Sequence, residues 1–235
     1  MIDSLSTSAA GAPQLGERLQ RVRSAIDHAA RSNERSADDI TLIVVTKFHP
    51  ASLVRDLVEL GVNDFGENRH QEASAKAAEL RDLPINWHFV GQLQSNKAKA
   101  VRSYANTVHS VDRASVVSAL DTPGADLLDC FLQLNLTEDP QRGGVSDEGL
   151  ERLAEQVLAA QSLRLRGVMA VAPLDENPRR AFERVRLASE RLRRMEPSAD
   201  AISAGMSHDF VDAIAEGATH LRIGSAITGN RPAQG

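Results

Sequence analysis

Lys47 follows directly on a run of uncharged residues with the composition of a buried strand. Residues 40–46 read ITLIVVT. At the end of such a strand we expect the lysine to be partly withdrawn from water, which favours the uncharged amine that attacks carbonyl carbons. The sequence therefore offers a lysine able to hold an aldehyde as a Schiff base. On position alone, a lysine that merely extends into solvent is the open alternative.

Two segments near the C-terminus combine small residues with hydroxyl groups, as phosphate sites do. Residues 203–207 read SAGMS and precede a predicted helix. Small residues let the backbone approach a phosphate, Ser207 offers a hydroxyl, and the helix start presents N–H groups. Gly224 and Ser225 offer a second set of donors after a later apolar run. Each segment alone is an ordinary turn, but together they favour a phosphate site.

Arg222 precedes the second of these segments and stands within the apolar run itself. A guanidinium that points toward the end of its strand stays protonated and can face a ligand. The alternative is that Arg222 pairs with Glu67 or another buried acid. Histidines and the lone Cys130 show no metal-ligand spacing, so no metal site is predicted. We expect Cys130 to be a buried strand residue, and His88 and His109 to face the core.

Eight short apolar runs alternate with helical patterns along the chain, which predicts right-handed β-α-β units and a parallel sheet. Eight such units close an α/β fold of the (β/α)8 TIM type. The helical patterns place Leu158 and Val211 on inward faces, and Leu15, Leu19 and Val22 predict an extra N-terminal helix. The predicted strands are 40–46, 62–66, 86–91, 107–111, 129–136, 165–171, 200–204 and 219–223.

Composition and length set the remaining expectations. The chain has 235 residues, and its 27 basic against 32 acidic residues give a net charge of −5, which argues against general nucleic-acid binding. No run approaches the roughly 20 apolar residues of a membrane span, and the N-terminus has no secretory pattern. We expect a cytoplasmic monomer with no membrane association, a single domain over 13–230, and flexible ends at 1–12 and 231–235.

Six motifs resemble, in order, those of the pyridoxal-5'-phosphate (PLP) homeostasis proteins, the YggS/PROSC family, from about residue 13 to residue 230. The resemblance implies a fold type III barrel, similar to the N-terminal domain of alanine racemase. It also implies a carrier or regulator of PLP rather than an enzyme with a known substrate. The motifs are VVTKFHP, DFGENRHQE, WHFVGQLQSNK, VHSVDR, RGVMAV and SAGMSHDFVDAIAEGATHLRIGSAITG.

The resemblance assigns a role to each candidate residue. It implies that Lys47 is the Schiff-base lysine and that Arg222 faces the pyridine nitrogen. An arginine there keeps the nitrogen unprotonated and weakens the ring as an electron sink. The phosphate would be held by Ser207, Gly224 and Ser225, and the ring would be lined by Asn68 and Met206.

Three departures from the family pattern are visible. Arg69 and His70 stand where the family usually has an aromatic residue after GEN, so the contacts of that loop should differ. Ser225 replaces a threonine and keeps the hydroxyl. Thr228 replaces an aromatic residue, which should cost packing rather than chemistry.

Two other functions share part of this pattern. A PLP-dependent racemase needs a second acid/base opposite Lys47. The only tyrosine, Tyr104, falls in a helical segment, and the chain ends about ten residues after Ser225, so we expect none. A Schiff-base aldolase without PLP would use Lys47 but would not need two phosphate segments and Arg222. The leading hypothesis is therefore PLP storage and supply without efficient catalysis, with apo PLP-dependent enzymes as recipients.

Overall fold

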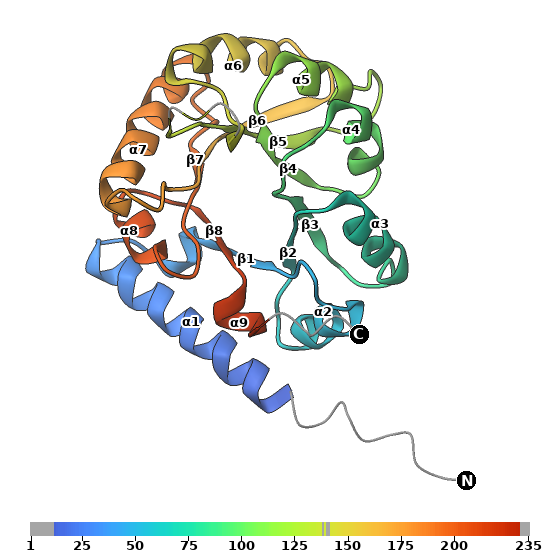
Figure 1. The fold of residues 1–235 in the computed structure, drawn as a ribbon, viewed down its shortest axis with the longest axis vertical. Helices are drawn as coiled ribbons and strands as arrows, with labels where there is room; N and C mark the ends of the chain where they lie inside the picture. Colours follow the sequence, from blue (N-terminus) through green and yellow to red (C-terminus); the bar gives the residue numbers. More distant parts are fainter. Residues whose placement is uncertain (1–11, 138, 140–141, 231–235) are drawn as a thin grey trace.

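The computed structural model describes residues 12–137, 139 and 142–230, and its centre is a closed barrel of eight parallel strands in sequential order. β8 pairs with β1 in the register Ile43↔Arg222 and Val44↔Ile223, which closes the barrel (Figure 1). The predicted TIM-type barrel is confirmed, and each strand lies within three residues of its predicted bounds. The strands are β1 (Thr41–Val45), β2 (Asp64–Glu67), β3 (Asn86–Phe89), β4 (Thr107–Val111), β5 (Leu128–Gln133), β6 (Leu163–Met169), β7 (Ala201–Ser203) and β8 (His220–Ile223).

Helices form a ring around the strands and bury one apolar face each against them (Figure 1). Two inward assignments are wrong: Leu158 is 41% exposed and Val211 is 51% exposed, because each lies at the edge of its helix's buried stripe. The ring contains α2 (Ala51–Glu59), α3 (His70–Glu79), α4 (Ser95–Arg102), α5 (Ala114–Leu120), α6 (Leu150–Leu158), α7 (Pro178–Met195), α8 (Phe210–Ala215) and α9 (Ser225–Thr228), with 3-10 turns at Ala37–Asp39 and Asp147–Gly149.

The predicted N-terminal helix is present as α1 (Ala12–Ser32), outside the ring (Figure 1). Its face of Leu15, Leu19 and Val22 is buried, as predicted. Arg18 Nε donates to the Ile227 carbonyl of α9 at 2.6 Å, so α1 supports the short helix that follows β8. The predicted flexible ends lie outside the described residues, apart from Ala12, which already belongs to α1.

The apolar core has two parts of unequal size. The large part fills the space between the strands and the helices, and among the described residues a second, small apolar cluster in the barrel interior consists of Phe131, Met169 and Ala201. TIM barrels usually fill this interior with branched aliphatic residues. Here buried polar side chains take much of that space, including His88 and His109, whose predicted burial is confirmed.

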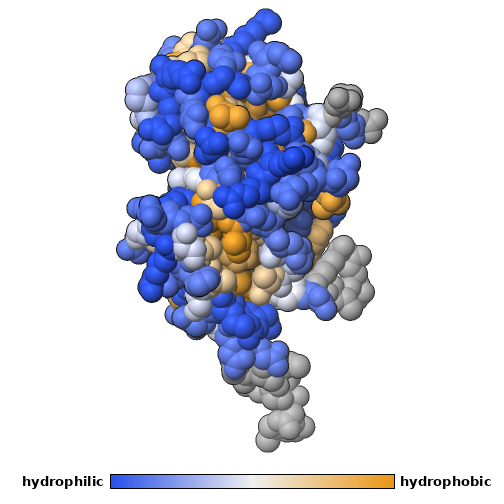
Figure 2. All heavy atoms as spheres, turned by 90° about the vertical axis from the view of Figure 1, so that its left-hand side faces the viewer, coloured by the Kyte–Doolittle hydropathy of each residue, from blue (hydrophilic) through white to orange (hydrophobic). Residues whose placement is uncertain are grey.

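The outer surface is mostly hydrophilic. Figure 2 shows the side that carries α1, α7 and α8, where apolar patches are separated by polar and charged surface. Leu187 on α7 and Val211 on α8 are exposed. Within residues 12–230, no described helix has the length and apolar character needed to cross a bilayer.

Candidate functional site

The predicted site residues gather at the carboxyl-terminal rim of four neighbouring strands, β7, β8, β1 and β2. Gly224 lies beside β1, because a Cβ added to it would stand 3.3 Å from the Val45 carbonyl oxygen. The chain thus brings together segments that are up to 178 residues apart in sequence (47 to 225). The predicted residues at this rim are Lys47 after β1, Asn68 after β2, Met206 and Ser207 after β7, Arg222 on β8, and Gly224 and Ser225 after β8.

Lys47 is the first exposed residue after β1. The expectation that its ammonium is withdrawn from water is wrong, because Thr46, one residue beyond β1, is the last buried residue before it. The next residue, Phe48, adopts a left-handed backbone with φ of 68°. A bulky residue in this region costs roughly 1–3 kcal/mol, so surrounding contacts must impose the conformation. The backbone conformation directly after Lys47 is therefore imposed by its surroundings.

A buried ion pair holds the chain before Lys47. Lys76 Nζ from α3 lies 2.5 Å from Glu67 Oε1 and donates to the Thr46 carbonyl at 2.7 Å. The Thr46 hydroxyl donates to the same Glu67 oxygen at 2.6 Å. Burial raises the pKa of Glu67, while the Lys76 ammonium and the Thr46 hydroxyl oppose that rise. Three buried polar groups therefore fix the end of β1.

The departures at Arg69 and His70 supply contacts of their own. Glu72 Oε2 accepts from the Phe48 N–H at 2.9 Å, and the Arg69 guanidinium stands 4.9 Å above the Phe48 ring. His70 stacks on Tyr104 with ring centroids 5.9 Å apart. This loop thus packs through a cation-π contact and a histidine-tyrosine pair, each worth roughly 0.5–1 kcal/mol when partly exposed.

The two predicted phosphate segments meet at the rim. Ser207 Oγ accepts a long 3.4 Å bond from the Ala226 N–H, which joins the segment after β7 to the first turn of α9. Gly205 is required in this segment, because its φ is +94° and a Cβ would come within 2.8 Å of Ala213. Ser225 is exposed at the start of α9. The two segments are therefore in contact at the rim.

Arg222 lies inside the barrel, just below the rim, and is 5% exposed. It does not pair with Glu67, which forms its ion pair with Lys76. Instead its Nη1 donates to Ser203 Oγ at 2.6 Å and its Nη2 donates to the Ala170 carbonyl at 2.8 Å. Burial lowers the pKa of Arg222 to about 10, with Asp209 opposing, so the guanidinium stays charged at neutral pH.

Asn68 lies at the rim directly after β2, and one of its polar atoms has no hydrogen-bond partner among the described residues. Its Oδ1 is buried and has no hydrogen-bond partner among the residues the structure describes. Gly91 packs directly on its backbone, since a Cβ there would lie 2.0 Å from the Asn68 carbonyl oxygen. A buried acceptor without a donor is costly, so a ligand that brings a donor would be stabilised here.

Sequence reasoning missed Lys76 and its partnership with Glu67. A signal was present: Ala73, Lys76 and Leu80 follow a spacing of three and four, so the lysine falls on the buried stripe of its helix. A lysine on such a stripe needs a buried acid as partner. The acid itself comes from a strand, and only the fold identifies it.

Comparisons with known proteins identify the family of this chain. The sequence profile of the family "Alanine racemase, N-terminal domain" matches residues 22–232. The pyridoxal phosphate homeostasis protein of Mycobacterium leprae is 38% identical over an alignment of 237 positions, and the alignment covers 92% of each chain.

Solved structures share the barrel. PipY of Synechococcus elongatus, solved with PLP bound, has a TM-score of 0.81 and 35% identity, over 92% of this chain and 100% of PipY. Alanine racemase of Corynebacterium glutamicum has a TM-score of 0.71 at 15% identity, over 94% of this chain and 61% of the racemase, a likeness of fold alone. The chain belongs to the pyridoxal phosphate homeostasis protein family, whose barrel is that of the alanine racemase N-terminal domain.

Proposed function

We propose that this protein binds PLP at the rim of β7, β8, β1 and β2 as a Schiff base on Lys47, and that it buffers and supplies the cofactor inside the cell. One observation carries the proposal: four adjacent strand ends present a lysine, two hydroxyl-bearing segments and a buried arginine. PipY, a relative of similar length, is described with PLP bound. An aldehyde, a phosphate and a basic ring nitrogen are the groups that this set suits.

Each part of PLP finds a suitable group in this set. The phosphate would take Ser207, Gly224 and Ser225, which offer hydroxyl and N–H donors. Arg222, held by Ser203 and the Ala170 carbonyl, would face the pyridine nitrogen. The ring would lie against Met206 and Asn68, and the buried Asn68 Oδ1 is an acceptor for a donor on the ligand. When bound, PLP supplies an aldehyde and an electron-accepting ring.

The phosphate contacts should dominate affinity. Hydrogen bonds to a charged group contribute about 1.5–3 kcal/mol each, so Ser207→Ala with Ser225→Ala should weaken PLP binding at least about tenfold. Pyridoxal, which lacks the phosphate, should bind poorly to the unaltered protein. Titration followed by absorbance measures both affinities, with Ser115→Ala on α5 as a matched exposed-serine control. Equal affinities for pyridoxal and PLP would assign these segments another role.

Storage and supply fit the site better than catalysis. Racemisation needs one group on each face of the substrate Cα, and Lys47 serves one face. Tyr104 stacks on His70 in the helical ring, where its hydroxyl lies 3.5 Å from His70 Nδ1, so it does not serve the other. An arginine at the pyridine nitrogen also weakens the ring as an electron sink. A racemase-like enzyme is the second candidate, favoured by the shared barrel.

Transfer of cofactor separates the two candidates. The PLP-loaded protein should restore activity to the apo form of a PLP-dependent enzyme while a scavenger removes free PLP. In a parallel assay with chiral detection, it should not turn over common amino acids. Turnover near the enzyme median of about 10 per second, lost in Lys47→Ala, would replace the carrier with the enzyme.

We further propose apo PLP-dependent enzymes as recipients and a cytoplasmic monomer as the working form. Cys130 is a free, fully buried thiol, which suits a reducing compartment.

A further inference from the structure

A row of hydrogen-bonded side chains crosses the interior of the barrel from Arg222 to the opposite mouth. Arg222 Nη1 lies 2.6 Å from Ser203 Oγ, which lies 2.9 Å from His109 Nδ1. His109 Nε2 then lies 2.9 Å from His88 Nδ1, and His88 Nε2 lies 3.0 Å from Asp64 Oδ1. We call these five residues the polar chain. It joins five strands, β2, β3, β4, β7 and β8, and each of its residues is hydrogen-bonded to the next.

The middle of the polar chain is buried. Ser203 and His109 are fully buried, and His88 is 5% exposed. His109 stacks on Phe131 with ring centroids 4.5 Å apart and an interplanar angle of 9°. Imidazoles in such a place are costly unless both ring nitrogens are bonded, and here both nitrogens of each ring are. Burial lowers the pKa of His109 well below its ordinary value, which keeps that ring neutral.

The groups at the two ends of the polar chain favour one direction for its hydrogen bonds, from donor to acceptor. Arg222 can only donate, so Ser203 Oγ accepts from it, and the hydroxyl proton of Ser203 is available to His109 Nδ1. If Nδ1 of the neutral His109 accepts the Ser203 proton, then His109 carries its own proton on Nε2 and donates it to His88.

The other end agrees with this direction. His88 then accepts at Nδ1 and donates from Nε2 to Asp64. Burial alone raises the pKa of Asp64, but hydrogen bonds from His88 and Asn86 outweigh burial and hold the pKa below its usual value, so Asp64 is the carboxylate that only accepts. With this assignment, every donor in the polar chain points from the cation Arg222 to the anion Asp64.

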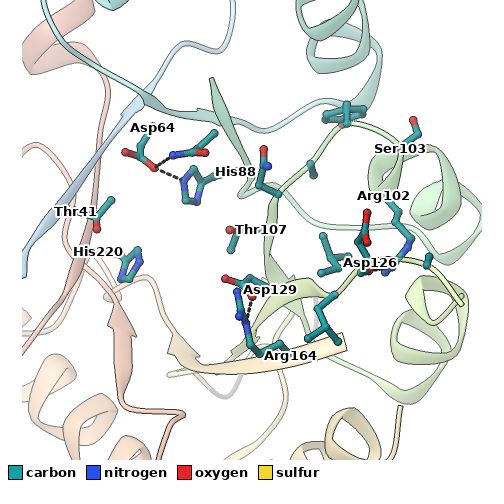
Figure 3. Close-up of a pocket in the computed structure, with 17 residues that line it drawn as sticks. Thr41, Asp64, His88, Arg102, Ser103, Thr107, Asp126, Asp129, Arg164 and His220 are labelled. Carbon is teal, nitrogen blue, oxygen red and sulfur yellow. Dashed lines mark hydrogen bonds and ion pairs between the residues drawn. The ribbon is translucent and has the colours of Figure 1, made fainter. Parts of the chain in front are cut away.

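Asp64 and His88 open onto a cavity of about 650 Å³ at the amino-terminal mouth, away from the rim that carries Lys47. Figure 3 shows the two residues joined by a hydrogen bond, in a pocket that His220 and Asp129 also line. The Asp64 side chain is 27% exposed, so solvent reaches this end of the polar chain. The far end is Arg222, which the proposed function places at the pyridine nitrogen.

We propose that Asp64, His88, His109 and Ser203 are positioning residues that orient Arg222 toward the cofactor and couple its guanidinium to the carboxylate at the opposite mouth. The inference rests on the proposed function for the cofactor's place, but the direction of the hydrogen bonds does not. Chains of aligned hydrogen bonds strengthen one another in a low dielectric. A change of charge at Asp64 therefore reaches the ring nitrogen through bonds rather than through solvent.

The first test uses the protein without PLP. With nitrogen-15 in the histidine rings, NMR should show that His88 and His109 each carry a proton on Nε2 and accept a hydrogen bond at Nδ1. Single His88→Gln and His109→Gln variants assign the signals. A proton on Nδ1 of His109 would reverse the direction and overturn the proposal, whether or not the protein binds PLP.

The second test uses PLP labelled with nitrogen-15 in its ring. Asp64→Asn and Ser203→Ala should move the ring-nitrogen signal and the absorption band of bound PLP in the same direction. Asp64→Glu, which restores a carboxylate at the open mouth, should return both toward the unaltered protein. Asp129→Asn is the matched control, because Asp129 lines the same cavity but bonds Arg164 at 2.5 Å and is outside the polar chain.

The outcomes are separable. Equal shifts in Asp64→Asn and Asp129→Asn, or no shift in Asp64→Asn, would overturn the coupling. Thermal unfolding shows whether Ser203→Ala is folded. If it is not, the Asp64→Asn variant alone tests the coupling, since position 64 is partly exposed and the change keeps the shape of the side chain. Failure of the unaltered protein to take up PLP would instead contradict the proposed function, and the histidine signals would still test the polar chain.

Discussion

Lys47→Ala is expected to abolish covalent retention of PLP after borohydride reduction, together with the visible absorption band of the bound cofactor. The chain has only four lysines. Lys76 is buried against Glu67, and Lys97 and Lys99 are exposed on α4, away from the strand ends that carry the phosphate segments. The loss should therefore be complete, and peptide mass spectrometry of the reduced protein measures it directly.

Two variants control this experiment. Lys47→Arg keeps the positive charge but cannot form a Schiff base, so it should lose covalent retention as completely as Lys47→Ala. Lys97→Ala removes an exposed lysine and should retain the label in full. Label recovered on Lys97 or Lys99 of the unaltered protein would show that the rim of β1 is not the attachment site.

Local patterns predicted the strands and the residues at their ends, because both depend on neighbours in sequence. The run before Lys47 reads as a strand from its β-branched residues alone, and the glycine and serine at 224 and 225 follow a second run. Once eight such runs close a barrel, their carboxyl ends must share a rim. The grouping of Lys47, Ser207 and Arg222 therefore follows from strand order without any knowledge of side-chain contacts.

Contacts between distant strands were beyond that reasoning. The polar chain links residues 64, 88, 109, 203 and 222, and no short-range periodicity records which of two buried side chains face one another. Arg222 illustrates the limit: the sequence offered Glu67 as a partner, whereas the fold gives that acid to Lys76. The exposure of Lys47 was misjudged for the same reason, because the end of burial depends on loops contributed by other strands.

The largest expected loss of stability is that of Lys76→Met. Lys76 is 7% exposed and Glu67 is 1% exposed, so removing the ammonium leaves the buried Glu67 carboxylate without its cation and the Thr46 carbonyl without the Lys76 donor. Breaking a buried ion pair in this way costs about 3–5 kcal/mol. Urea unfolding at pH 8 should show this decrease in the free energy of unfolding. Lys99→Met, at an exposed position on α4, should change it by no more than about 0.5 kcal/mol.

The pH dependence of that loss identifies Glu67 as its cause. Burial raises the pKa of Glu67 in the folded state, and without Lys76 the opposing ammonium is gone. Folded Lys76→Met then binds a proton that the unfolded chain has already released above about pH 4.3, so its stability falls as the pH rises toward the folded pKa. The deficit should be smaller at pH 5 than at pH 8, and Glu67→Leu with Lys76→Met should recover at least half of it, because no charge stays buried. An equal deficit at both pH values, with no recovery in the double variant, would mean that Lys76 stabilises the fold through packing and not through its charge.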